Sequence, residues 1–336
     1  MTVCGPSIMT VSGPISPSSL GFCHSHEHLF LAAGRSAELN PALRMEDYKK
    51  TLDELLLFKS VGGGAIVDAQ PVGCGRMAHF LEKASAESGV HVIASTGFHK
   101  LCFYPDDHWI HSLSETEIAQ IFASEYEHGM YTDADEHRPT RRTKARPGVI
   151  KTASDTQGVK GPYQRLFVAA CEASEETGLP VISHTEMGVG ALEQVKLFLD
   201  HGIPAQSIII CHLDRALQDV QYHLEVAQSG VYLEFDTIGR FKYHSDEEEA
   251  RFILTMVEHR YEDQILIGLD TTRERLKSYG GAMGLDYISA TFVPLLRNYG
   301  LPESTLQKFT VANPARAFTN YKVPYEGSSS VSKRVR

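Results

Sequence analysis

The residues that first suggest chemistry are three histidines and a glutamate in the segment "GFCHSHEHLF", positions 21–30, which otherwise reads as a buried strand. Side chains alternate along a strand, so His26 and His28 point one way while Glu27 points the other, towards the helices. His24 shares the parity of His26 but lies further from the strand end, so we expect it to pack. Two imidazoles on one face could bind a single divalent cation. Core histidines whose nitrogens are hydrogen-bonded within the protein would give the same sequence pattern. This segment alone keeps both interpretations open.

Four further residues of ligand type stand at or near the ends of other apolar runs. They are Lys151 in "GVIKTA", His184 in "PVISHT", His212 in "SIIICH" and Asp270 in "QILIGLD". A buried lysine is costly unless it is paired or neutralised. A salt bridge between Lys151 and Asp270 would account for those two residues but would leave four histidines without a role. Taken together, the six residues favour a metal site.

Short apolar runs alternate with amphipathic helical patterns along the whole chain. With the first histidine segment, the runs at 64–69, 90–98, 148–153, 180–185, 207–212, 231–236 and 264–270 make eight expected strands. Such alternation predicts a parallel sheet. Because there are eight units, we predict a fold of the α/β class, a closed (β/α)8 TIM barrel. No GxGxxG follows the first strand, so a dinucleotide-binding sheet is not indicated. Barrel enzymes build their sites at the C-terminal ends of the strands, where these six residues would converge.

The chain organisation indicates one domain over residues 1–325, followed by a flexible C-terminal tail over 326–336, which is small, polar and basic. The connection across 99–147 is unusually long and should contain a helix at about 113–128. Long loops at the C-terminal face of a barrel usually cover an active site.

Composition excludes several classes of partner. A formal net charge of −10 argues against a general nucleic-acid binder, which needs a basic surface. No run approaches the ~18 apolar residues that span a bilayer, so we expect no membrane partner and a cytoplasmic location. Six scattered cysteines without a CxxC pair fit reduced thiols. A homodimer is the base-rate expectation for a barrel.

Over residues 10–320 the chain resembles the phosphotriesterase-like family of the amidohydrolase superfamily. The resemblance rests on "HEH", "IK", "SH", "CH" and "GLD" at the expected strand ends and on "NPAR" at 313–316. It implies a binuclear site with His26, His28 and Asp270 on one metal and His184 and His212 on the other. Lys151, carboxylated by CO2 to N6-carboxylysine, would bridge both metals. Imidazole and carboxylate ligands suit Zn2+, and also Mn2+, Co2+ or iron.

The resemblance also implies a mechanism. A hydroxide bridging the metals would attack the substrate, and Asp270 would be the catalytic acid and base that moves the proton to the leaving group. In the phosphotriesterases proper a histidine after strand seven relays the proton outward, but here "EFDTIGR" has Thr237 at that place. This departure makes organophosphates a less favoured substrate class.

The loops after strands seven and eight, "DTIGRFKYH" and "DTTRERLKSYGG", carry several cations and predict an anionic substrate. The second loop resembles a subgroup that hydrolyses lactones of phosphorylated sugars, which indicates a pentono-1,4-lactone with a terminal phosphate. Lys242, Arg273 and Tyr279 are expected to hold the phosphate, followed by Arg275. Phosphotriesterase, carboxylesterase or amidohydrolase activity at the same site, and a non-catalytic binding protein on the same barrel, are the alternatives.

Overall fold

The strands form one parallel sheet in which neighbours in sequence are neighbours in space. The structure, a computed structural model, describes residues 5–322, so the predicted tail at 326–336 lies outside the described residues. Within them the sheet runs in unbroken order from β3 to β10. The strands are β3 (Phe22–Glu27), β4 (Gly63–Asp68), β5 (His91–Gly97), β6 (Val149–Ala153), β7 (Val181–His184), β8 (Ile208–Cys211), β9 (Tyr232–Phe235) and β10 (Ile265–Ile267). The predicted α/β barrel of eight parallel strands is confirmed.

The first and last strands meet and close the barrel. Ser25 Oγ donates to the carbonyl of Ile267 at 2.8 Å, and the Asp270 amide donates to the carbonyl of His26 at 3.0 Å. A Cβ on Gly268 would lie 2.9 Å from the His26 oxygen, so glycine is what permits this approach. Closure therefore brings Asp270 beside the histidines of β3.

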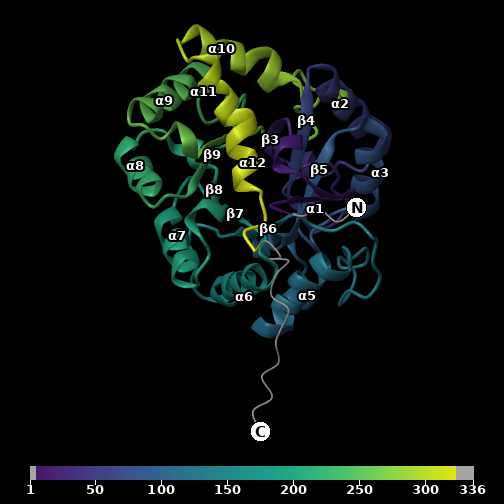
Figure 1. Cartoon of the computed structure of the whole chain (residues 1–336). Coiled ribbons are helices and arrows are strands. Elements are labelled where there is room, and N and C mark those ends of the chain that lie inside the picture. Colours follow the sequence, from purple (N-terminus) through teal and green to yellow (C-terminus); the bar gives the residue numbers. More distant parts are fainter. Residues whose placement is uncertain (1–4, 323–336) are drawn as a thin grey trace.

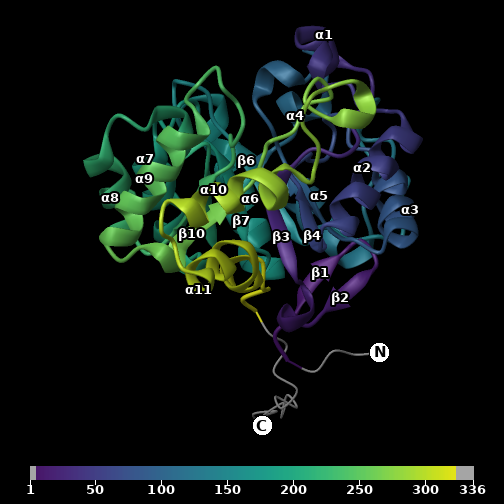
Figure 2. The same cartoon turned by 90° about the horizontal axis from the view of Figure 1, so that it is seen from above.

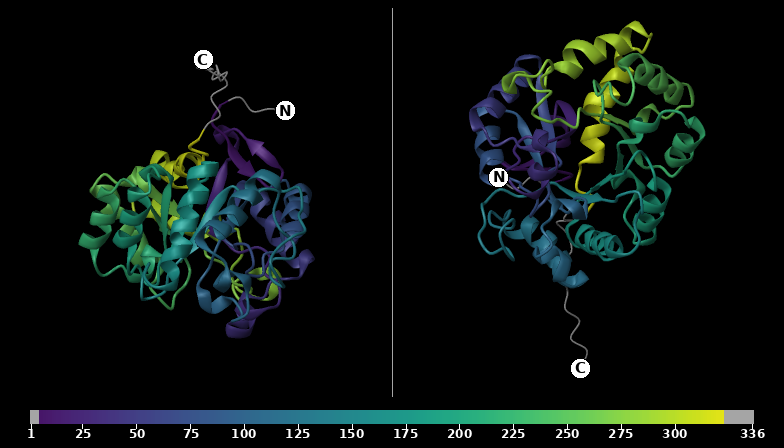
Figure 3. Two further views of the ribbon diagram at one scale, coloured as in Figure 1. Left: turned by 90° about the horizontal axis from the view of Figure 1, so that it is seen from below. Right: turned by 180° about the vertical axis from the view of Figure 1, so that it is seen from behind.

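Helices surround the barrel and cover its outer face (Figure 1; Figure 3 shows the same ring from behind). The helix expected at about 113–128 is confirmed as α5, which begins with a capping box between Ser114 and Glu117. No helix among residues 5–322 has the length and apolar character to cross a bilayer. The helices are α1 (Arg35–Leu39), α2 (Tyr48–Ser60), α3 (Ala78–Ser88), α4 (Trp109–Ser112), α5 (Glu115–His128), α6 (Pro162–Thr177), α7 (Ala191–Asp200), α8 (Val220–Gln228), α9 (Asp246–Glu258), α10 (Val293–Asn298), α11 (Glu303–Gln307) and α12 (Asn313–Ala317).

A hairpin that the sequence analysis did not anticipate lies at the N-terminal end of the barrel. Strands β1 (Ile8–Thr10) and β2 (Gly13–Ile15) pair antiparallel. The Val11 amide donates to the carbonyl of Val92, near the start of β5, at 2.9 Å. In Figure 2 the hairpin and α1 lie at opposite ends of the molecule. The hairpin covers the N-terminal end and leaves the C-terminal end for the site.

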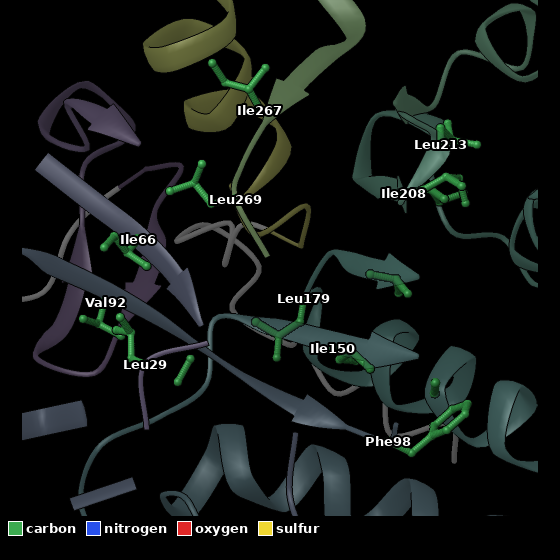
Figure 4. Packing of buried hydrophobic residues seen from close by; sticks show 14 of the residues in the cluster. Leu29, Ile66, Val92, Phe98, Ile150, Leu179, Ile208, Leu213, Ile267 and Leu269 are labelled. Atoms are coloured by element: carbon green, nitrogen blue, oxygen red, sulfur yellow. The ribbon is translucent and has the colours of Figure 1, made fainter. Parts of the chain in front are cut away.

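Apolar side chains form one layer inside the barrel and another between strands and helices. Val149, Ile182 and Ile209 belong to the inner cluster, whereas Ile150 and Ile208 belong to the outer one, part of which Figure 4 shows. Because side chains alternate along a strand, the residue two positions beyond an inner residue also points inward. Lys151 follows Val149 and His184 follows Ile182 in this way.

The expectation that His24 points inward with His26 is wrong. The pairing of β3 with β4 shifts register between His24 and Glu27, so strict alternation breaks there. The His24 ring packs 4.6 Å from that of Phe58 on α2, and its Nδ1 lies 2.9 Å from Glu27 Oε1. Glu27 also accepts the amides of Leu269 and Thr271, so it ties β3 to the segment that carries Asp270.

Gly97 determines how closely β5 approaches β6 at Lys151. Its φ is +95°, and a Cβ there would overlap the Lys151 carbonyl oxygen. We expect Gly97→Ala to lower the free energy of unfolding by roughly 2–5 kcal/mol, combining left-handed backbone strain with overpacking. Gly280 is a matched control because its φ is +94° and no described atom lies within 4 Å of the added Cβ. Gly280→Ala should cost only about 1–2 kcal/mol in urea unfolding. Equal losses would contradict the packing argument.

Candidate metal centre

The predicted ligands converge on one pocket at the C-terminal end of the barrel. Five of the six line it directly, and its volume is about 130 Å³. Lys151 is fully buried beside them. The lining residues are His26, His28, Leu31, Ser36, Asn40, Leu43, Gln70, His99, Lys100, Phe103, His184, His212, Arg215, Arg240, Asp270 and Thr272.

One set of donor atoms comes from the end of β3, the residue that follows it and the segment after β10. His28 Nε2 lies 3.3 Å from Asp270 Oδ1, and His26 Nε2 lies 3.8 Å from the same oxygen. His26 Nδ1 donates to Glu234 at 2.8 Å, which fixes the ring and leaves Nε2 for the pocket. These three side chains could hold one divalent cation.

A second set comes from the ends of β7 and β8. The rings of His184 and His212 lie 4.4 Å apart between centroids. His212 Nδ1 donates to Asp236 at 2.6 Å, and His184 Nε2 lies 3.4 Å from Glu186. Each ring is thus oriented by a carboxylate through one nitrogen, and the other nitrogen is available to a cation.

Lys151 contacts the first set, its charge also contributes to the lowered pKa of His184, and it has no carboxylate partner among the described residues. Its Nζ is 3.3 Å from His26 Nε2, and no carboxylate of residues 5–322 lies within 4.0 Å of it as an ion pair. The salt bridge considered from sequence is not formed, because Asp270 Oδ2 pairs with Arg215 at 2.7 Å and Arg240 at 3.2 Å. A buried ammonium without a counter-charge is costly. A carbamate on the same stem would supply anionic oxygens to both sets, so the donor set fits a pair of cations.

The protonation states suit metal ligands. Burial, followed by the charge of Lys151, holds the pKa of His26 well below its usual value. Burial likewise lowers the pKa of His184 to about 3 and that of His212 well below normal. Burial alone would raise the pKa of Asp270, but Arg240, His28, His212 and Arg215 together hold it well below its usual range. Neutral imidazoles and an ionised carboxylate are the forms that bind cations.

Two of these residues have left-handed backbone, with φ of 63° at His212 and 47° at Asp270. Non-glycine residues rarely adopt this conformation, and where they do the surrounding structure must hold them. The His212 amide donates to Asp236 and the Asp270 amide to the His26 carbonyl. Strain of this kind concentrates at functional sites.

The structure brings the four predicted phosphate-binding residues only partly together. Lys242 and Arg275 line a second hollow, which adjoins the pocket because both share Asn40, Arg240 and Thr272. The Arg275 guanidinium donates to the carbonyls of Leu269 and Ile238, which anchors the loop.

The other two predicted phosphate-binding residues line neither hollow. The backbone amide of Arg273 donates to the carbonyl of Ala42 at 3.0 Å. The Tyr279 hydroxyl lies 2.9 Å from Thr51 Oγ1 and donates to the carbonyl of Asp47 at 3.0 Å, so it packs against the start of α2.

The residues of the pocket wall that sequence reasoning missed include His99, Lys100 and Arg215. His99 and Lys100 lie two and three positions after the end of β5, so the strand-end rule that selected His184 could have found them. Arg215 follows His212 by three residues in "CHLDR". Its pairing with Asp270 depends on the turn after β8, which periodicity does not describe.

The long connection across 99–147 reaches the site only at its start. His99, Lys100 and Phe103 line the pocket, and Lys100 Nζ pairs with Glu186 at 2.9 Å. Lys144 and Arg146 instead border a hollow with the N-terminal hairpin. Residues 104–147 therefore do not line the pocket, contrary to the expectation that this connection covers the site.

Comparison with known proteins identifies the family of this chain. Residues 6–318 match the sequence model of the phosphotriesterase family. The phospho-furanose lactonase of Mycoplasmopsis synoviae is 30% identical over 91% of this chain and 90% of its own length. The N-acetyltaurine hydrolase of Rattus norvegicus is 29% identical over 95% of this chain and 99% of its own. The crystal structure of a lactonase from Listeria monocytogenes superposes with a TM-score of 0.86 at 30% identity, over 94% of this chain and 100% of that one.

Proposed function

Since the chain belongs to the phosphotriesterase family and is therefore a metal-dependent hydrolase of ester bonds, we propose that it opens the ring of a phosphorylated sugar 1,4-lactone. The observation that carries this proposal is the cationic wall of the pocket. Lys100, Arg215 and Arg240 line it in a chain whose formal net charge is −10, and Lys242 and Arg275 line the adjoining hollow. Lactonases among the relatives support the ring-opening reaction.

We assign the six predicted ligands to two divalent cations, Zn2+ in preference to Mn2+ or Co2+. One cation would be held by His26, His28 and Asp270. The other would be held by His184 and His212. Lys151, as a carbamate, would bind both cations. When bound, such a pair lowers the pKa of a shared water towards neutrality and polarises the scissile carbonyl. The donor distances and the unpaired Lys151 support this assignment.

Asp270 is the residue that moves the proton. Its carboxylate would take the proton of the attacking water and return it to the ring oxygen as that oxygen leaves. Arg215 and Arg240 both contact Oδ2, which leaves Oδ1 facing His28. The two guanidiniums thus fix the carboxylate in one orientation.

The phosphate would occupy the hollow beyond Arg240. Arg240 borders both spaces, so a lactone ring in the pocket could extend its terminal phosphate towards Lys242. Lys242 is exposed and makes a cation–π contact with Tyr243, with Nζ 4.6 Å from the ring centroid. An ammonium held in this way is available to an anionic ligand.

Amide hydrolysis is the second candidate, because relatives at 28–29% identity are N-acetyltaurine hydrolases. The test compares kcat/KM of the Zn2+-loaded protein for pentono-1,4-lactone 5-phosphate and for N-acetyltaurine at one pH. We expect the lactone to be preferred and both activities to disappear when a chelator removes the metal. A higher kcat/KM for the amide would overturn the lactonase proposal and leave the metal centre in place.

Lys242→Ala is expected to lower kcat/KM for the phosphorylated lactone by ~10-fold or more, since a hydrogen bond to a charged group contributes ~1.5–3 kcal/mol. The unphosphorylated lactone should be unaffected. Lys277→Ala is the matched control, because Lys277 pairs with Asp286 at 2.7 Å and lines neither hollow. If both variants keep the full preference for phosphate, Lys242 does not contact it.

A further inference from the structure

A second cluster of ligand-type side chains lies outside the pocket. Asp214, His244 and Glu249 each offer one donor atom within 4.8 Å of the others, and all three side chains are buried. Asp214 belongs to the turn after β8, whereas His244 and Glu249 lie just before and in the first turn of α9. Asp214 thus meets two residues that lie 30 or more positions further along the sequence.

The carboxylates of this cluster lack the partners that burial requires. Asp214 and Glu249 are both fully inaccessible to solvent. Neither oxygen of Glu249, nor Oδ1 of Asp214, has a hydrogen-bond partner among residues 5–322. The other Asp214 oxygen accepts the Thr237 amide. Within the same residues no lysine or arginine forms an ion pair with either carboxylate. Two buried carboxylates side by side need a compensating positive charge, which is either a shared proton or a cation.

We propose that Asp214, His244 and Glu249 hold a third divalent cation, Zn2+ or Mn2+, which is separate from the binuclear centre. Carboxylate oxygens with one imidazole are a donor set for these ions. His244 Nδ1 lies 3.6 Å from Glu249 Oε2 and 3.2 Å from the Ser245 carbonyl, and a cation on Nδ1 would replace the bond to that carbonyl. Donors placed about 2.0–2.2 Å from one ion lie up to ~4 Å apart, so donor atoms that now lie within 4.8 Å of one another would draw together around the ion.

The surroundings provide a route for the ion. His244 also lines a surface hollow with Tyr243 and Arg251, so one edge of the cluster opens to solvent. Water entering from this hollow can complete the coordination, as in other sites with few protein ligands.

The cation would stabilise the position of Asp236, which orients the expected metal ligand His212. The Thr237 amide donates a hydrogen bond to Asp214 Oδ2, and Thr237 directly follows Asp236. Asp236 in turn accepts from His212 Nδ1 at 2.6 Å. An ion on Asp214 would therefore fix the end of β9 behind the binuclear centre, without touching substrate.

The test measures bound metal rather than activity. Protein loaded with Zn2+ and freed of excess should hold three equivalents per chain by elemental analysis, whereas Glu249→Gln and His244→Asn should each hold two. Glu247→Gln, an exposed acid on the same turn of α9, is the control and should keep three. A wild-type content of two, or variants that keep the wild-type content, would overturn the proposal in favour of a proton shared by the carboxylates.

Anomalous diffraction from wild-type crystals near the zinc edge needs no variant to fold. A peak between Asp214, His244 and Glu249 supports the site, and peaks at the binuclear centre alone overturn it. Because both measurements locate or count metal, their result is independent of whether lactones are the substrate.

Discussion

Asp270→Asn is expected to lower kcat for lactone opening by about 10³-fold, within the range that a positioned acid or base contributes. Asparagine keeps an oxygen where Oδ1 approaches His28, at 3.3 Å in the native chain, but it cannot accept the proton. Metal content should therefore stay near the wild-type value while turnover falls. Steady-state kinetics and elemental analysis of the same preparation provide both quantities.

Asp53→Asn is the control for this variant, because Asp53 is exposed on α2 and pairs only with Lys49 among the described residues. It should keep the wild-type kcat. If Asp270→Asn retains full metal and turns over at the wild-type rate, Asp270 does not transfer the proton.

Lys151→Ala is expected to abolish both tight metal binding at the binuclear centre and turnover. Removing this completely buried side chain removes the only expected ligand of both cations. Lys151→Glu should recover part of both properties, since it returns a carboxylate to the site. The measurements are metal content and kcat for each variant, with native mass analysis of the wild type for the added CO2.

Lys196→Ala is the matched control, because this lysine is exposed on α7 and pairs with Asp200 at 2.7 Å. Its metal content and turnover should equal those of the wild type. Two tightly bound metals at the binuclear centre in Lys151→Ala would contradict the bridging role.

Regular periodicity explains why much of this site could be predicted from sequence. Lys151 and His184 lie on strands that keep strict alternation, so their inward direction follows from the apolar residues two positions before them. His212 directly follows β8, and the parallel order of the strands brings all these ends together. The family resemblance added the pairing of the residues into two ligand sets, which remains a prediction, as do the homodimer and the cytoplasmic location.

The parts of the site that periodicity could not predict are those that depend on irregular backbone. Asp270 follows the end of β10 by three residues, and its place depends on a left-handed φ and on a bond to His26. The register shift in β3 turned His24 outward. Tyr279 packs on α2, where its hydroxyl forms a hydrogen bond with Thr51. This contact joins segments more than 200 residues apart. Local sequence carries little information about such contacts.

The most direct test of the account is kcat/KM of the Zn2+-loaded protein for a pentono-1,4-lactone with and without the 5-phosphate, at one pH and salt concentration. We predict a preference of a hundredfold or more for the phosphorylated lactone, equivalent to ~2.7 kcal/mol of transition-state binding. Equal rates would contradict the phosphate site beyond Arg240, and no turnover of either lactone would contradict the proposed lactonase activity.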